Sequence, residues 1–195
     1  AKKQGIPAIH VVSPSVWAWR RNRIPKIAAK LDALLCLFPF EPALYAGTGL
    51  KTTFIGHPLA NQIVFNPDAQ SARVSLDLAL STPCVAILPG SRLGEVHRLL
   101  PLFLDAFDRA CLIRSDLTAV IPAATPALFD VIQSRVGTRP VQVIHGESRH
   151  AMAAADVVLL ASGTAALEAV LTGRPTVAAY RMNPWTYRLV KGRLE

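Results

Sequence analysis

Two short turns in this sequence carry residue types that bind anions. The turn PGSR, at residues 89–92, follows the apolar run Val85–Leu88, and the turn SGT, at residues 162–164, follows the run Val157–Leu160. Each turn precedes a stretch with helical periodicity, and the first backbone N–H groups of a helix have no partner within it. A glycine, a hydroxyl and a helix N-terminus together suit a phosphate group.

The first turn offers three different contacts to an anion. Gly90 lets the backbone approach a ligand closely, Ser91 carries a hydroxyl, and Arg92 can bind phosphate oxygens through two N–H groups. A surface turn without function also reads Pro-Gly-Ser-Arg, so this turn alone does not separate the two interpretations.

The second turn opens the predicted helix Ala165–Leu171 with Ser162, Gly163 and Thr164. Ser162 or Thr164 would also suit the N-cap of that helix, without any ligand. An N-cap role for these hydroxyls does not explain Glu168, which lies one turn inside a helix composed otherwise of Ala, Leu and Val. A charged carboxylate buried in such a helix is costly unless it has a partner. Ribose hydroxyls are suitable partners, as in dinucleotide-binding folds.

Together these residues describe a site for a nucleoside diphosphate. The sequence has no Walker lysine motif, which argues against phosphoryl transfer. A sugar nucleotide that serves as the donor of a glycosyltransferase fits better. No spacing typical of metal ligands, such as CxxC or HExxH, is present, so we expect neither a metal nor a cofactor.

The elements that must position these turns follow from the hydrophobic pattern. Eight apolar runs alternate with helical patterns, which predicts a doubly wound α/β sheet, and continuously apolar strands are typical of a parallel sheet covered on both faces. The predicted strands are Ala8–Val12, Ala33–Leu37, Thr52–Ile55, Val85–Leu88, Thr118–Ile121, Val141–Ile144, Val157–Leu160 and Thr176–Ala179.

One helix is predicted in more detail by six apolar residues at i, i+3 and i+4 spacing, which form one buried face. Pro101 lies within this pattern and either kinks the helix or starts a second one. The six residues are Val96, Leu99, Leu100, Phe103, Leu104 and Phe107.

The polar, weakly periodic stretch between the two halves predicts a linker at 66–83. We therefore expect a first domain at 1–65 and a second at 84–195. The first opens with a strand already under way and has no Gly-rich turn of its own, so we expect its front part to be absent.

The composition limits the class of protein. With 51% hydrophobic and 17% charged residues the chain is expected to fold, and its net charge of +8 should attract phosphates or anionic lipid. No basic cluster with interleaved aromatics is long enough to indicate nucleic acid. The densest one, WAWRRNR at 17–23, fits a membrane headgroup zone, a sugar site or two tryptophans at the edge of a core.

The cysteines and the apolar runs of the sequence predict the cellular compartment of the protein. Cys36, Cys84 and Cys111 lie in apolar stretches and predict reduced core thiols, which suits the cytoplasm. The first residues contain no apolar core or cleavage site, so we expect no signal peptide. Polar residues interrupt the apolar stretches well before the ~20 residues of a membrane span, so we expect no such span.

Five blocks of this sequence resemble the lipid-A-disaccharide synthase family of glycosyltransferases, in its order and spacing. They are SPSVWAWR (13–20), FPFE (38–41), FIGHPLA (54–60), LPGSRLGEV (88–96) and ASGTAALEAVLTGRPTVAAYRMNPWTY (161–187). The resemblance implies a GT-B fold (glycosyltransferase family 19) with two Rossmann-like domains, here with the first truncated and the C-terminal tail missing. It implies metal-free transfer of 2,3-diacylglucosamine from its UDP conjugate to 2,3-diacylglucosamine 1-phosphate, which yields the β-1,6-linked lipid A disaccharide 1-phosphate and UDP.

The resemblance also implies roles for individual residues. The UDP-binding residues would be Gly90, Ser91, Arg92, Ser162, Gly163, Thr164 and Glu168, with the loop HGES at 145–148 near the uracil. Trp17, Arg20 and His57 would face the acceptor or the sugar. His57 is a candidate base, although a histidine between Gly and Pro is more often a satisfied loop residue. The family's acidic turn, where a base is expected, has no counterpart here.

The resemblance further implies a Gram-negative source, a peripheral position on the anionic cytoplasmic face of the inner membrane, and a homodimer. Two alternatives remain open. One is another UDP-sugar enzyme of the GT-B type, such as a peptidoglycan N-acetylglucosaminyl transferase or a 2-epimerase. The other is a chain that only binds nucleotide, without turnover.

Overall fold

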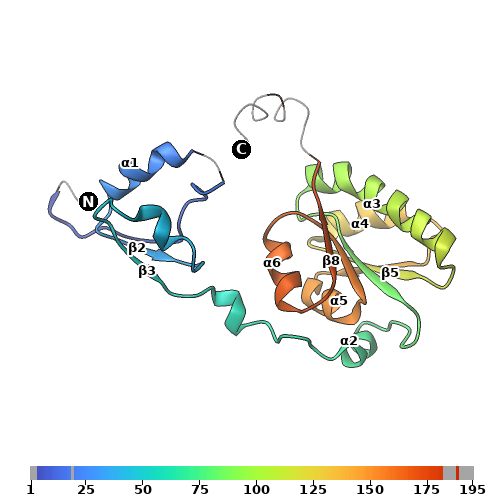
Figure 1. The fold of residues 1–195 in the computed structure, drawn as a ribbon. Coiled ribbons are helices and arrows are strands. Elements are labelled where there is room, and N and C mark those ends of the chain that lie inside the picture. The colour runs from blue at the N-terminus through green and yellow to red at the C-terminus, as the bar shows by residue number, and fades with distance from the viewer. Residues whose placement is uncertain (1–3, 19, 182–187, 189–195) are drawn as a thin grey trace. The chain divides into compact units, whose positions relative to one another are not determined.

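The computed structural model describes residues 4–18, 20–181 and 188. These residues form two units, the first extending to Gln62 and the second running from Ile63 to Arg181, and each contains its own sheet (Figure 1). All strand pairs in both sheets are parallel. The predicted α/β class and the prediction of two units with parallel sheets are therefore confirmed.

The first unit contains a three-stranded sheet close to the predicted positions. Its strands, in spatial order, are β1 (Ile9–Val11), β2 (Ala33–Cys36) and β3 (Lys51–Phe54). The connections contain helix α1 (Ile24–Ala28) and the 3₁₀ helices η2 (Arg21–Arg23), η3 (Pro42–Tyr45) and η4 (Pro58–Asn61). The core of this unit is small and consists of Val16, Leu34, Cys36 and Tyr45.

The second unit contains a five-stranded sheet in the order β6-β5-β4-β7-β8. The strands are β4 (Cys84–Leu88), β5 (Thr118–Ala123), β6 (Val141–His145), β7 (Val157–Ala161) and β8 (Thr176–Ala179). The chain winds outward from β4 on one side and then returns to continue on the other. The sheet therefore switches direction between β4 and β7, which is where open α/β sheets bind ligands. Because Leu88 pairs with Leu160, the two predicted anion-binding turns leave the sheet from neighbouring strands.

Helices cover both faces of this second sheet. Within β4, Val85 and Ile87 contact one cluster, while Ala86 and Leu88 belong to the other. The first cluster is completed by α3 (Leu93–Ile113) and α4 (Pro126–Val136), and the second by α5 (Ser148–Ala154) and α6 (Thr164–Leu171). Residues on both faces of the central strand β4 are thus removed from water, as its continuously apolar run predicts, whereas the edge strand β8 leaves Val177 exposed.

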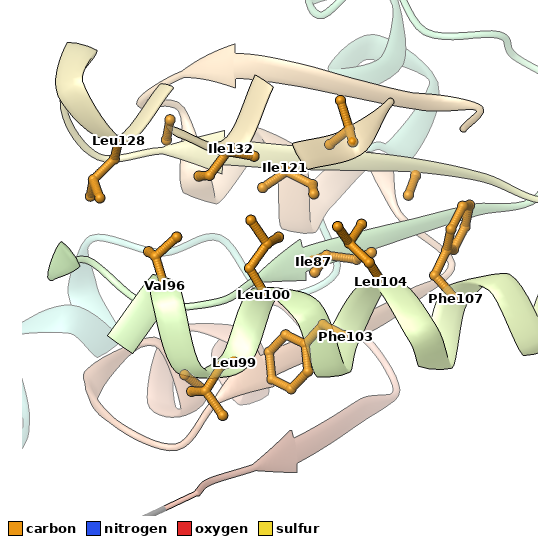
Figure 2. Packing of buried hydrophobic residues seen from close by; sticks show 14 residues of the cluster. Ile87, Val96, Leu99, Leu100, Phe103, Leu104, Phe107, Ile121, Leu128 and Ile132 are labelled. Atoms are coloured by element: carbon orange, nitrogen blue, oxygen red, sulfur yellow. The ribbon is translucent and has the colours of Figure 1, made fainter. Parts of the chain in front are cut away.

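Helix α3 confirms the predicted buried stripe. Figure 2 shows Val96, Leu100 and Leu104 on the side of α3 that faces Ile121 of β5 and residues of α4. The helix continues through Pro101 without interruption, which excludes the two-helix alternative. All six predicted residues are buried, and each contributes about 1.5–3 kcal/mol at most by leaving water.

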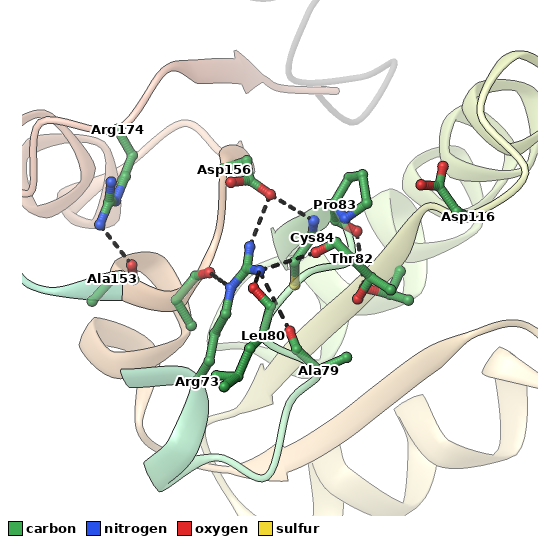
Figure 3. A network of polar contacts seen from close by, with 12 residues as sticks. Arg73, Ala79, Leu80, Thr82, Pro83, Cys84, Asp116, Ala153, Asp156 and Arg174 are labelled. Atoms are coloured by element: carbon green, nitrogen blue, oxygen red, sulfur yellow. Dashed lines mark hydrogen bonds and ion pairs between the residues drawn. The ribbon is translucent and has the colours of Figure 1, made fainter. Parts of the chain in front are cut away.

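The predicted linker at 66–83 is wrong. This segment contains helix α2 (Ala69–Ser75), whose Ala72 packs against Ala153 and Ala154 of α5. Arg73 of α2 is 5% exposed and forms a polar network with the loop that precedes β4 (Figure 3). A polar, weakly periodic stretch looks like a linker when the partners of its polar side chains lie far away in the sequence.

The three cysteines are free thiols, as predicted. Cys36 and Cys84 are buried and Cys111 is half-buried. Burial raises the pKa of each thiol, which reduces the fraction of reactive thiolate. These side chains therefore serve packing in both units.

Candidate functional site

A cleft of about 630 Å³ lies at the carboxyl edge of the second sheet. Leu88 and Ala161, the last residues of β4 and β7, line it, together with first-turn or capping residues of α3, α5 and α6. All seven residues predicted to bind UDP line this one cleft: Gly90, Ser91, Arg92, Ser162, Gly163, Thr164 and Glu168. The volume lies within the range of about 300–1,000 Å³ typical of small-molecule sites.

The helices that begin at the cleft lack side-chain caps. Arg92, Glu147 and Gly163 occupy the N-cap positions of α3, α5 and α6, and none of them makes a capping hydrogen bond through its side chain. By contrast, the side chains of Asp68 and Thr125 cap α2 and α4. The N–H groups at the starts of the long helix α3 and of α6 are therefore left for an anion.

The first turn depends on a close approach between Gly90 and Glu95. Gly90 has a φ of +123°, and a Cβ atom at this position would lie 2.7 Å from Oε2 of Glu95. Arg92 donates from Nη1 to Oε1 of Glu95 at 3.1 Å, yet its side chain is 81% exposed. Because so exposed an ion pair contributes only about 0–1 kcal/mol, a phosphate group can compete for Arg92.

The second turn differs from its prediction in one respect. Ser162 and Thr164 are exposed, and neither caps α6, because Gly163 occupies the N-cap position. The helix was expected to be buried throughout, but Ala169 is its one buried residue. Its outer side faces solvent because β7 and β8 cover only part of it. Glu168, whose side chain is 20% exposed, lines the cleft one turn inside the helix.

Arg149 is a residue of the site that sequence reasoning missed. It lies on α5 and donates to Oε1 of Glu168 from Nη2 at 3.2 Å and from Nε at 3.4 Å. The prediction that Glu168 needs a partner is therefore met within the protein itself. The single sequence signal was the position of Arg149 directly after the loop at 145–148.

The loop predicted to lie near the base forms part of the cleft. Gly146 and Glu147 have positive φ values of 60° and 56°, and both line the cleft with Ser148, which opens α5. His145 does not line it, and its ring stacks on Phe129 with centroids 3.9 Å apart. The loop thus contributes three of its four residues to the cleft.

The C-terminal edge of β8 adds one aromatic side chain. Tyr180 is 53% exposed and lines the cleft, so an accessible aromatic side chain borders the site. Trp185, in the family block at 161–187, lies outside the described residues.

The residues predicted for the acceptor side lie in the first unit. Trp17 is 44% exposed and contacts Phe40 edge to face, with ring centroids 5.7 Å apart. Phe38 stacks on Phe40 and also lies 5.7 Å from the ring of His57. Trp17 and His57 therefore belong to one aromatic cluster, whose two phenylalanines come from the block FPFE. Arg20 precedes η2 in a left-handed conformation, with φ of 61°.

The geometry of His57 favours the interpretation as a loop residue. It is the N-cap of η4, and its Nδ1 accepts a hydrogen bond from the backbone N–H of Leu59 at 3.2 Å. In the neutral ring this bond places the proton on Nε2, which then donates. Such a tautomer offers no vacant nitrogen for a general base.

Two further features are absent from residues 4–18, 20–181 and 188. No three His, Cys, Asp or Glu side chains gather there in a way that would hold a metal ion. Nor does any helix in these ranges combine the length and apolarity required to cross a bilayer.

Comparisons with known proteins agree with the predicted family. A family model described as lipid-A-disaccharide synthetase matches residues 1–194. The lipid-A-disaccharide synthase of Xanthomonas oryzae pv. oryzae (strain MAFF 311018) is 46% identical over 195 residues, which cover 97% of this chain and 45% of the relative. That of Azoarcus sp. (strain BH72) is 44% identical, and the match covers 97% of this chain and 50% of the relative.

A solved structure shares the fold. The crystal structure of the GtfA/B complex matches with a TM-score of 0.51 at 16% identity, over 85% of this chain and 34% of that chain. The chain spans about half the length of the curated relatives it matches. Since the family model covers nearly every residue, the chain belongs to the lipid-A-disaccharide synthetase family.

Proposed function

We propose that the cleft of the second unit binds the UDP portion of a sugar nucleotide, as part of a lipid-A-disaccharide synthase. The observation that carries this proposal is that six residues from two distant turns, together with Glu168 of α6, line one cleft at the switch point of a parallel sheet. Family membership supports UDP as the nucleotide and a glycosyltransferase as the class of enzyme.

The proposed donor is UDP-2,3-diacylglucosamine and the proposed acceptor is 2,3-diacylglucosamine 1-phosphate. The bond between the anomeric carbon and UDP breaks, a bond to the 6-hydroxyl oxygen of the acceptor forms, and UDP and a proton leave. Negative charge grows on the departing diphosphate, and we propose that Arg92 and the N-termini of α3 and α6, which border the cleft, stabilise it. Glu168 would accept hydrogen bonds from the ribose hydroxyls.

We also propose a peripheral position on the cytoplasmic face of the inner membrane, and a homodimer. A net charge of +8 supports attraction to anionic lipid, and the exposed Trp17, three residues before Arg20 in the sequence, suits an interfacial zone. Sedimentation with vesicles of anionic phospholipid, and loss of binding at high salt, would test the first of these statements. Light scattering of the full-length protein would test the second.

The nucleotide site is tested by replacing Arg92 with alanine and titrating the chain with UDP and with uridine. Removing a charged hydrogen bond costs about 1.5–3 kcal/mol, so Arg92→Ala should weaken UDP about 10- to 150-fold. Uridine should bind almost as before, because it has no phosphate. Arg109→Ala is the matched control, since Arg109 is a 77% exposed arginine of α3 that does not line the cleft. Equal losses in both variants would contradict the assignment.

Transfer itself is tested with a full-length protein that contains these residues. UDP release from UDP-2,3-diacylglucosamine should require the acylated acceptor. Equal turnover with unacylated sugars would favour a peptidoglycan-type transferase, and isomerisation of the donor without acceptor would favour a 2-epimerase. Either result would exclude the proposed reaction.

A further inference from the structure

The ion pair between Arg149 and Glu168 joins two helices at the edge of the cleft. Both contacts from Arg149, at 3.4 Å from Nε and 3.2 Å from Nη2, go to the same oxygen, Oε1 of Glu168. Within the part of the chain that the structure describes, the second oxygen, Oε2, has no hydrogen-bond partner. The arginine thus occupies one half of the carboxylate and leaves the other half unoccupied.

The two partners differ in their access to the cleft. Glu168 lines it, with a side chain that is 20% exposed, whereas Arg149 is 43% exposed and is not among the lining residues. The neighbours of Glu168 along α6 are Leu167 and Ala169, which offer the carboxylate no hydrogen bond. Without Arg149, the carboxylate would be partly desolvated, unpaired and free to change rotamer.

We infer that Arg149 is a positioning residue for ribose recognition, which acts through Glu168 and does not touch the nucleotide. This inference rests on the proposed function, because it presumes that the cleft binds a nucleoside diphosphate. Arg149 fixes the rotamer of the Glu168 carboxylate through Oε1, and Oε2 accepts hydrogen bonds from the ribose hydroxyls. A site built to bind hydroxyls rejects an analogue without them, because its polar group is then left unpaired.

The experiment is a double-mutant cycle on the 195-residue chain, with variants Arg149→Gln, Glu168→Gln and the combination. Calorimetric titrations compare UDP with 2′,3′-dideoxyuridine 5′-diphosphate, which keeps the base and the diphosphate but lacks both hydroxyls. Arg149→Gln should weaken UDP about 3- to 10-fold and leave the dideoxy nucleotide unchanged, so that the preference for ribose falls. In the Glu168→Gln background the same substitution should have no further effect.

Two more variants separate positioning from general damage to the fold. Arg149→Lys keeps the charge with fewer fixed donors, and should retain part of the preference for ribose. Arg114→Gln removes a 63% exposed arginine whose side chain pairs with Asp116 and does not line the cleft, and this variant should bind both nucleotides like the wild type. Melting temperatures of all variants show whether they fold.

The outcomes distinguish the inference from the function on which it rests. If Arg149→Gln weakens both nucleotides equally, or remains effective when Glu168 is already changed, Arg149 contacts the ligand or merely supports the fold, and the inference is wrong. If Arg149→Gln leaves the preference for ribose unchanged while UDP still binds, the inference alone is also wrong. A wild-type chain that does not bind UDP would overturn the proposed function and this inference together.

Discussion

Arg73 should contribute more to stability than any other polar side chain of the second unit, and mainly through backbone carbonyl groups. It is 5% exposed, and its guanidinium makes all its hydrogen bonds within this unit (Figure 3). The acceptors are the carbonyl oxygens of Ala154 (2.8 Å), Leu80 (2.8 Å), Thr82 (3.1 Å) and Ala79 (3.4 Å), and Oδ2 of Asp156 (2.9 Å). We therefore propose to replace Arg73 with methionine, which keeps an unbranched stem of similar bulk to the aliphatic part of arginine but donates no hydrogen bond.

The magnitude follows from the burial of each partner. The side chain of Asp156 is 58% exposed, so its ion pair with Arg73 contributes only about 0–1 kcal/mol. The carbonyl of Ala154 is buried, and leaving such an acceptor unpaired costs about 1–3 kcal/mol. The partly buried carbonyls before β4 add to this, so we expect Arg73→Met to cost about 3–5 kcal/mol in total. Asp156→Asn should cost about 1 kcal/mol or less, because the amide oxygen still accepts from the N–H of Cys84.

The assay is urea unfolding followed by far-ultraviolet circular dichroism. Tryptophan fluorescence would not report on this unit, because all three tryptophans (Trp17, Trp19 and Trp185) lie outside residues 63–181. Arg73→Met should lower the midpoint without changing the m-value, and Arg73→Lys should fall between this variant and the wild type. If Asp156→Asn is as destabilising as Arg73→Met, the ion pair dominates and the reasoning from carbonyl groups is refuted.

Two further predictions concern other contacts of the second unit. Gly90→Ala should lower the free energy of unfolding by about 1–3 kcal/mol and weaken UDP binding, because φ at Gly90 is +123° and the new Cβ would clash with Glu95. Gly94→Ala is the control in the same urea and UDP titrations, since the atom nearest to its new Cβ would lie 3.8 Å away. The hydrogen bonds from Arg139 hold the pKa of Asp108 below its usual value of about 3.9. The Arg139–Asp108 pair therefore stabilises the fold above that pH, and this stabilisation is lost as the pH falls through the lowered pKa. Asp108→Asn should therefore lower the urea midpoint at about pH 6, and its effect should shrink as the pH falls below about 3.9. A difference that is constant with pH would contradict this.

Much of the fold and site could be predicted because the signals are local. Short apolar runs predict the strands, and apolar residues at i, i+3 and i+4 spacing predict the buried face of α3. The chemistry of the turns is local as well, since Gly90 and Arg92 act next to the helix that follows them. Each of these features needs only the identity of neighbouring residues.

The tertiary structure decided which distant residues meet. Whether the turns at 89–92 and 162–164 share a cleft depends on β4 and β7 being neighbours, and nothing in either strand specifies its partner. The same holds for Arg149 with Glu168 on separate helices, and for the polar segment containing Arg73, which looked like a linker. The local sequence determines whether a segment forms a strand, a helix or a turn, and which chemical groups it carries. Strand order determines which segments become neighbours, because only the packing of the whole sheet brings groups that are far apart in the sequence within hydrogen-bonding distance.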